Sequence, residues 1–305
     1  MFGDVGMELT QVKGNTWLLE ANQLIPLYKL DDRRCVLLDS GLFQEREELE
    51  ETLKAAGLTP AGILCSHAHV DHCANNGYLQ EKYGTVVALT PPEAGMCSSL
   101  LTLKCYFLTL SPGTVARESS CMVHRPDVSI PMSDGPFGFC GAAFQIIHTP
   151  GHSAGHICVV TPDNVCYTAD ALLSRELLAA KLPYSLSHQT ALVSREKLRD
   201  LDCDAYIMAH RGVCGPGEIG PLIDANQALV RRRAEEILSL VERPMTASQI
   251  DEAACVLYEL FTHKPPRSLR FERNVRFFIE YLVDTGRLSQ VCQNGTTYYV
   301  RPENT

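Results

Sequence analysis

The sequence has no Cys-x-x-Cys pair, although it contains 13 cysteines. Pairs at that spacing are typical of zinc ribbons, and an odd number of scattered cysteines does not suit a disulfide framework. We therefore expect free, mostly buried thiols, as in proteins of the reducing cytosol. The first residues also lack a basic head followed by an apolar stretch, so a secretory signal is not expected. The predicted location is cytoplasmic.

Long apolar runs, internal repeats and low-complexity tracts are also missing from the sequence. A membrane-spanning helix needs about 18 or more apolar residues in a row, so no membrane association is expected. The length of 305 residues and the apolar fraction of 45% predict one large globular domain, with or without a smaller one.

Positive charge is scarce in the first part of the chain. The net charge is −9 over residues 1–221 and 0 over residues 222–305. An acidic main body is a poor electrostatic partner for nucleic acid, so this balance counts against a nuclease and favours a small-molecule substrate.

Apolar runs broken by turn residues alternate with amphipathic segments over the first 210 residues, which predicts an α/β fold. Helices are expected at residues 45–56 and 75–83. Strands are expected at residues 15–20, 26–30, 34–39, 62–65, 85–89, 144–148, 157–160, 165–168 and 201–208. The segment 91–117 is helical in character. It either lines a substrate pocket or forms a packed helical hairpin without ligand contact.

A glycine-rich stretch, residues 212–220, marks the predicted boundary between a catalytic domain (1–221) and a C-terminal module (222–305). The module is expected to contain three helices followed by a hairpin, at residues 222–241, 246–261, 271–285 and 288–300. This order resembles a winged helix.

One stretch, residues 66–73, concentrates metal-ligating side chains in a His-x-His-x-Asp-His pattern. In an extended segment His67 and His69 point the same way, and the following turn can aim Asp71 and His72 at a second point. Imidazole nitrogens and carboxylate oxygens are ligands of zinc and similar ions. The stretch therefore predicts a metal site.

Three further polar residues follow predicted strands. His152 sits in a Pro-Gly turn, Asp170 ends a hairpin strand, and His210 follows residues 201–208. Ligands on strand-end loops are held by a rigid sheet, which suits a preorganised site.

These motifs occur in the order found in the metallo-β-lactamase superfamily, which the chain resembles over residues 8–215. The resemblance rests on four segments: residues 67–72, 149–156, 169–171 and 209–212. It implies an αββα sandwich of two facing sheets with helices outside, followed here by the small helical, winged-helix-like domain.

The resemblance also implies two divalent metal ions, most simply zinc, with iron or manganese as alternatives. The first ion would take His67, His69 and His152, and the second would take Asp71, His72 and His210. Asp170 would bridge them. A hydroxide shared by the ions would be the nucleophile, and Asp71 would be the catalytic residue that orients it or takes a proton. His156 fits better as a hydrogen-bonding partner of a ligand.

Comparison within the superfamily favours a glyoxalase II-like hydrolase. Persulfide dioxygenases use a single iron and lack the last histidine, which is His210 here. Flavodiiron proteins carry Glu in place of His69. Lactonases place a tyrosine soon after the bridging aspartate, whereas Leu172 and Leu173 follow Asp170.

Arginines recur every third residue in the C-terminal module, at positions 267, 270, 273 and 276. They form either a basic face for phosphates or an ion-paired helix face, and the neutral module favours the second. We expect a role in dimerisation, giving a homodimer, or in covering the pocket. The leading hypothesis is a two-zinc hydrolase of a small ester, thioester or lactone. The alternatives are a metal-dependent endoribonuclease or phosphodiesterase whose module binds RNA, and a non-catalytic binding protein.

Overall fold

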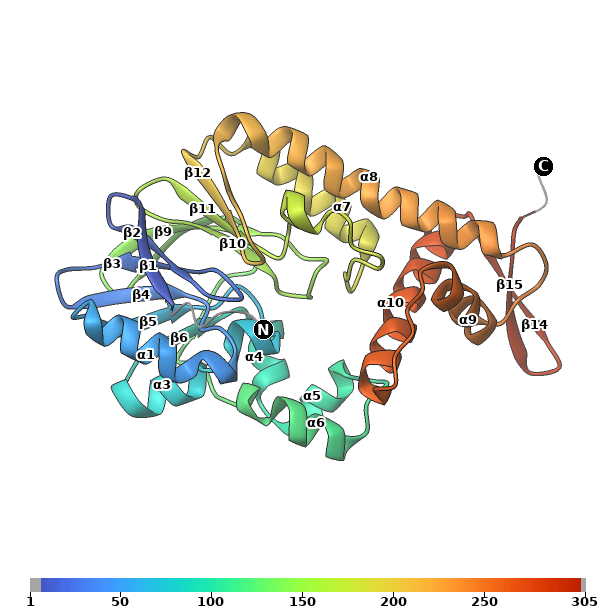
Figure 1. The fold of residues 1–305 in the computed structure, drawn as a ribbon, viewed down its shortest axis with the longest axis horizontal. Helices are drawn as coiled ribbons and strands as arrows, with labels where there is room; N and C mark the ends of the chain where they lie inside the picture. Colours follow the sequence, from blue (N-terminus) through green and yellow to red (C-terminus); the bar gives the residue numbers. More distant parts are fainter. Residues whose placement is uncertain (1–6, 303–305) are drawn as a thin grey trace.

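The computed structural model describes residues 7–302. Two β-sheets face each other, and helices cover the outer face of each (Figure 1). The predicted α/β class and αββα arrangement are confirmed. None of the helices in the described residues is long and apolar enough to cross a membrane.

The first sheet has seven strands in chain order, antiparallel from β1 to β4 and parallel from β4 to β7. Its strands are β1 Glu8–Lys13, β2 Thr16–Glu20, β3 Ile25–Lys29, β4 Arg34–Leu38, β5 Thr59–Leu64, β6 Val86–Leu89 and β7 Val128–Ser129. Helices α1 Arg46–Ala55 and α3 Asn76–Tyr83 lie outside this sheet (Figure 1).

The second sheet has six strands in the order β13-β12-β11-β10-β9-β8, with only β11 and β12 parallel. Its strands are β8 Gly135–Phe139, β9 Ala142–His148, β10 Ile157–Val160, β11 Val165–Ala169, β12 Ala205–Met208 and β13 Val213–Cys214. Helices α7 His188–Lys197 and α8 Pro216–Leu240 cover it. Between the sheets, Val36 and Leu64 pack in one buried apolar cluster with Tyr167 and Ile207. This cluster holds the two sheets, and hence their edges, in fixed relation.

Three short helices, α4 Pro91–Cys97, α5 Leu100–Tyr106 and α6 Pro112–Ser119, lie between β6 and β7 in sequence. They correspond to the segment predicted as helical at residues 91–117. In Figure 1, α5 and α6 lie below the sandwich and face the start of α10 Pro265–Asp284.

Within the glycine-rich stretch 212–220, which marks the predicted domain boundary, helix α8 begins at Pro216. Gly215 is extended and caps the helix, and proline is favoured in the first turn because its missing N–H has no partner to lose there. The domain boundary predicted at residues 221/222 lies inside this continuous helix, so the division of the chain stays a prediction.

The C-terminal region contains the end of α8, then α9 Ala247–Leu257, α10, and a hairpin of β14 Ser289–Gln293 and β15 Thr296–Val300. Val230, Ile250 and Phe278, one from each helix, share a buried cluster. An additional helical region is therefore present, with helices before a hairpin as predicted, while the winged-helix assignment stays a prediction.

Candidate metal centre

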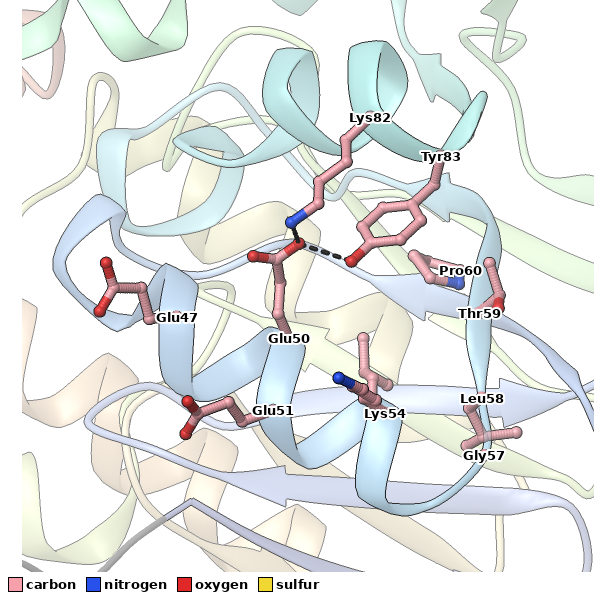
Figure 2. Close-up of a pocket in the computed structure, with 11 residues that line it drawn as sticks. Glu47, Glu50, Glu51, Lys54, Gly57, Leu58, Thr59, Pro60, Lys82 and Tyr83 are labelled. Atoms are coloured by element: carbon pink, nitrogen blue, oxygen red, sulfur yellow. Dashed lines mark hydrogen bonds and ion pairs between the residues drawn. The ribbon is translucent and has the colours of Figure 1, made fainter.

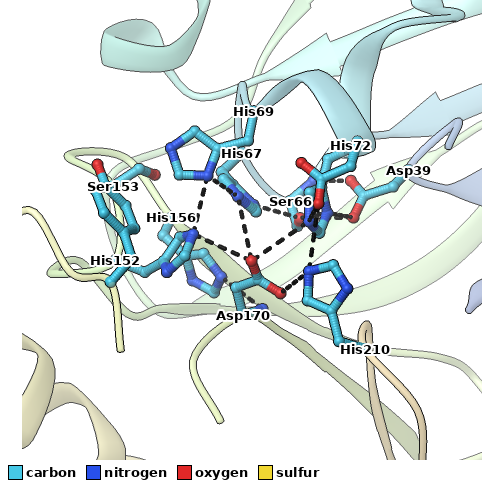
Figure 3. A network of polar contacts seen from close by, with 12 residues as sticks. Asp39, Ser66, His67, His69, His72, His152, Ser153, His156, Asp170 and His210 are labelled. Carbon is cyan, nitrogen blue, oxygen red and sulfur yellow. Dashed lines mark hydrogen bonds and ion pairs between the residues drawn. The ribbon is translucent and has the colours of Figure 1, made fainter. Parts of the chain in front are cut away.

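The strand ends bring all seven predicted ligands together at one edge of the sandwich (Figure 3). The loop after β5 carries His67 and His69, and the short helix α2 Val70–Cys73 carries Asp71 and His72. The other three, His152, Asp170 and His210, follow β9, β11 and β12. The side chains form two groups, whose donor atoms within each group lie within 4.8 Å of one another.

The first group consists of His67, His69, His152 and Asp170. His69 Nδ1 lies 2.8 Å from His67 Nε2 and 2.9 Å from His152 Nε2. Asp170 Oδ2 lies 3.1 Å from His152 Nε2. Three imidazole nitrogens and a carboxylate oxygen therefore converge on one point.

The second group consists of Asp71, His72 and His210. Asp71 Oδ2 lies 3.3 Å from His210 Nε2 and 3.7 Å from His72 Nε2. Asp170 reaches this group as well, because its Oδ1 lies 3.4 Å from His210 Nε2 and its Oδ2 3.5 Å from His72 Nε2. The carboxylate of Asp170 thus faces both groups.

These residues fit a pair of divalent cations. His72 Nε2 is buried and has no hydrogen-bond partner in the described protein. An orphaned buried nitrogen is costly unless something satisfies it, and a cation held between His72, Asp71 and His210 would do so. The donor set of imidazoles and carboxylates suits zinc, iron or manganese.

The two groups differ in protonation. Burial, followed by repulsion from neighbouring imidazoles, holds the pKa of His67 and His69 well below the usual range, so both rings are neutral and able to bind a cation. Burial also opposes charge on His72 and His210, but the carboxylates of Asp71 and Asp170 outweigh it. They raise the pKa of His72, and they raise the pKa of His210 to about 10. A cation in the second group would therefore displace protons.

Asp39, which the sequence analysis missed, orients His72. It follows β4, is fully buried, and has one carboxylate oxygen 2.7 Å from His72 Nδ1. The same carboxylate accepts hydrogen bonds from the Ser66 N–H at 2.6 Å and the Tyr167 hydroxyl at 2.7 Å. This contact leaves His72 Nε2 directed into the site. Its position directly after a strand parallel to β5 was the signal that could have found it.

Glu93 on α4, also missed, joins the two ligand loops. Its buried carboxylate accepts hydrogen bonds from the Ala68 N–H at 2.8 Å, and from the Ser153 hydroxyl and the Gly155 N–H at 2.7 Å each. Burial raises the pKa of this carboxyl group, although the three bonds oppose the rise. Gly155 is required here, because a Cβ atom would overlap the Thr90 hydroxyl. The loops that carry His67, His69 and His152 are thereby tied to one side chain.

His156 lies beside the first group but is not one of its members. Its Nε2 accepts the Asp170 N–H at 3.3 Å, and its Nδ1 lies 2.9 Å from the Thr149 hydroxyl. The ring therefore positions Asp170, in line with the hydrogen-bonding role expected from the sequence.

A cavity of about 270 Å³ opens onto the ligands His69 and Asp71. Tyr106 at the end of α5 and Tyr184 in the loop before α7 also line it, so segment 91–117 contributes to the pocket. The Tyr106 hydroxyl contacts His69 Nε2 and lies 2.6 Å from the Tyr184 hydroxyl. Of the two expectations for this segment, the pocket-lining one describes the structure.

A larger cavity, of about 690 Å³, lies between α1 and α3 and contains none of the seven ligands (Figure 2). Within it, Glu50 accepts hydrogen bonds from Lys82 and Tyr83 at 2.6 Å each, so these groups already have partners in the protein. Size alone therefore does not mark the reactive site, and the smaller cavity is the one joined to the metal ligands.

The family model of the metallo-beta-lactamase superfamily matches residues 9–210, a range that includes every ligand described above. The chain belongs to the metallo-beta-lactamase superfamily. The resemblance predicted from the motifs is thereby confirmed.

Among curated relatives of this superfamily member, a hydroxyacylglutathione hydrolase of Rhizobium meliloti (strain 1021) is 25% identical over 195 residues, covering 63% of this chain and 64% of the relative. The probable metallo-hydrolase YqgX of Bacillus subtilis (strain 168) is 25% identical, over 50% of this chain and 64% of its own length. The chain thus spans just under two thirds of the length of these relatives.

Two solved structures match nearly the whole chain. A metallo-beta-lactamase family protein from Thermus thermophilus has a TM-score of 0.70 at 21% identity, covering 97% of this chain and 98% of its own. A beta-lactamase domain protein from Burkholderia ambifaria has a TM-score of 0.74 at 17% identity, covering 98% and 97%. The shared fold therefore includes the C-terminal helices.

Proposed function

We propose that this superfamily member is a hydrolase that uses two zinc ions to cleave a small ester, thioester or lactone. The observation that carries the proposal is the Asp170 carboxylate, whose oxygens face both ligand groups. The names of the curated relatives, hydroxyacylglutathione hydrolase and metallo-hydrolase, support the thioester within this range.

In this proposal, His67, His69 and His152 would hold one ion, and Asp71, His72 and His210 the other, with Asp170 between them. When bound, the ions supply Lewis acidity and lower the pKa of water. Asp71 lines the cavity. Although burial opposes its ionisation, His72 and His210 outweigh burial and hold its pKa well below the usual range. The ionised carboxylate can therefore orient an attacking water, or take its proton, beside the bond to be cleaved.

RNA is not the substrate we propose. Of the arginine row on α10, Arg270 forms an ion pair with Glu118 at 2.8 Å, and Arg276 donates to the Tyr299 hydroxyl at 3.2 Å. Side chains engaged with their own protein do not offer a continuous phosphate-binding face. A homodimer and a cytosolic location, the latter suggested by thirteen free cysteines, complete the proposal.

The test is metal analysis of the purified protein together with turnover of an ester, thioester, lactone and phosphodiester panel. We expect about two zinc ions per chain and hydrolysis of a carbonyl substrate that stops on chelation and returns with added zinc. Undiminished hydrolysis by fully metal-free protein would overturn the proposal. Cleavage of the phosphodiester alone would replace it with the nuclease alternative.

A further inference from the structure

Helix α10 of the C-terminal region supplies one wall of the cavity beside the metal ligands. Arg270 and Arg273, one helical turn apart, both line it, together with His69 and Asp71. Figure 1 shows α10 with its start near α5 and α6 and its other end beside α8 and α9. The C-terminal region thus takes part in forming the pocket.

The two arginines are in different states. Arg270 is engaged with Glu118, which neutralises it. Within residues 7–302, Arg273 forms no ion pair with a carboxylate, and its Nε is buried without a hydrogen-bond partner. Its one hydrogen bond, from Nη2 to Asn274 Oδ1, is long at 3.4 Å. A buried N–H without a partner is costly, and the remaining donors of this guanidinium lie at the pocket, where they can bind a ligand.

Aromatic contacts hold Arg273 in a fixed position relative to the metal ligands. Its guanidinium lies 4.5 Å from the centre of the Tyr184 ring. The Tyr184 hydroxyl is 2.6 Å from that of Tyr106, which in turn contacts His69 Nε2. Stacking on a ring leaves the edge of the guanidinium, where its N–H donors lie, available for a planar anion.

We propose that Arg273 recognises a carboxylate group on the substrate, so that the enzyme acts on small anionic esters or thioesters. This inference rests on the proposed hydrolase function and narrows its substrate class. The cation is notable in a chain of net charge −9, which by itself would repel an anionic substrate. A cavity of about 270 Å³ limits the substrate to a small molecule with its carboxylate near the scissile bond.

The test compares two thioesters that differ only in charge: S-acetyl thioglycolate, which carries a carboxylate, and S-acetyl thioglycolamide, its neutral amide. We expect the wild type to prefer the carboxylate. In Arg273→Gln, kcat/KM for the carboxylate should fall about 10- to 100-fold, mainly through KM, because a charge-assisted pair is lost. The amide should change less than about twofold. For Arg273→Lys, kcat/KM for the carboxylate should lie between the values of the wild type and Arg273→Gln, because lysine keeps the positive charge but lacks the paired N–H donors of arginine.

Arg267→Gln is the matched control, since Arg267 is an exposed arginine of the same helix that does not line the cavity. It should leave both substrates unchanged. An equal loss for both thioesters in Arg273→Gln, or no loss in either, would overturn the inference while leaving the hydrolase intact. If the wild type prefers the amide, the inference is also overturned, and this result does not depend on whether Arg273→Gln folds. A wild type that cleaves neither thioester would overturn this inference, and the metal analysis and substrate panel described above would then decide the proposed function separately.

Discussion

The two walls of the pocket are built in different ways. On the sandwich side, the ligands stand on strand-end loops, and buried carboxylates such as Asp39 and Glu93 fix those loops. On the opposite side, Tyr106, Tyr184 and Arg273 come from a short helix, a loop and the C-terminal helix, and they meet through their side-chain tips. The first wall determines which chemistry is feasible, and we infer that the second determines which molecule receives it.

The largest loss of bound metal and of activity is expected when Asp170, on the sandwich wall, is changed. Asp170→Ala removes the carboxylate that faces both groups, so we expect loss of bound metal and a fall in kcat of at least about 10³-fold. This exceeds the roughly 10–100-fold cost of losing a ligand's hydrogen-bonding partner. Metal content after dialysis and thioester turnover are the measurements. Asp200→Ala, at an exposed aspartate, is the control, and a normal metal content in Asp170→Ala would contradict the assignment.

A smaller loss of metal affinity is expected when a residue that hydrogen-bonds to a ligand is changed. Asp39→Asn keeps the shape but removes the charge that holds His72 Nδ1, so zinc affinity should fall about 10- to 100-fold. Competition with a chromophoric chelator measures it. Asp163→Asn changes another carboxylate that accepts hydrogen bonds, from the Asn15 N–H and the Thr16 hydroxyl, and should leave affinity unchanged. Equal affinities in wild type and Asp39→Asn would show that His72 is positioned by packing alone.

Lowering the pH should weaken metal binding by the second group. Carboxylates raise the pKa of His210 to about 10, so at pH 6–8 this ring carries a proton that an incoming cation must displace. Because protons and metal compete, affinity should fall about tenfold per unit of decreasing pH for each proton released, and the raised pKa values of His72 and His210 allow up to two. Chelator competition at pH 6, 7 and 8 tests this slope for each ion. A second-ion affinity that does not change with pH would contradict the electrostatic picture.

The smallest effect should come from the tyrosine contact between the walls. Tyr106→Phe removes a hydroxyl that contacts His69 and Tyr184, so kcat/KM should fall about two- to tenfold, as for loss of one neutral hydrogen bond. Tyr83→Phe is the control, because it removes a hydroxyl that binds Glu50 in the other cavity. A loss as large as that of Asp170→Ala would mean that both walls take part in the chemistry.

The difference between the two walls of the pocket also explains which of their residues could be predicted from the sequence. The ligands lie in compact motifs after strands, and the resemblance to the superfamily implied how they group, although β5 belongs to the first sheet and β9, β11 and β12 belong to the second. Asp39 was overlooked because Asp39-Ser40-Gly41 also suits an ordinary turn. Tyr106, Tyr184 and Arg273 are far apart in sequence and meet only through tertiary packing, which no local pattern encodes.

Element boundaries were hardest to predict where proline is present. Helix α10 begins at Pro265, whereas the sequence analysis predicted a start at residue 271. Proline in a first turn is compatible with a helix, as in α8 and α10 alike. Strands β1 and β8 were also not predicted. Half-exposed edge strands such as these lack a continuous apolar run.

The number of residues in helix α8 determines how the C-terminal helices are placed beside the pocket. Ile223 packs in the cluster beside the second sheet and Val230 in the C-terminal cluster, so one uninterrupted helix serves both cores. Each residue in an α-helix adds about 100° of rotation and about 1.5 Å of rise. One residue inserted between Ile223 and Val230 would therefore turn the C-terminal helices through about 100° relative to the sandwich and carry Arg273 away from the ligands. The number of residues between these two positions of α8 therefore sets the distance and the orientation between the two walls of the pocket.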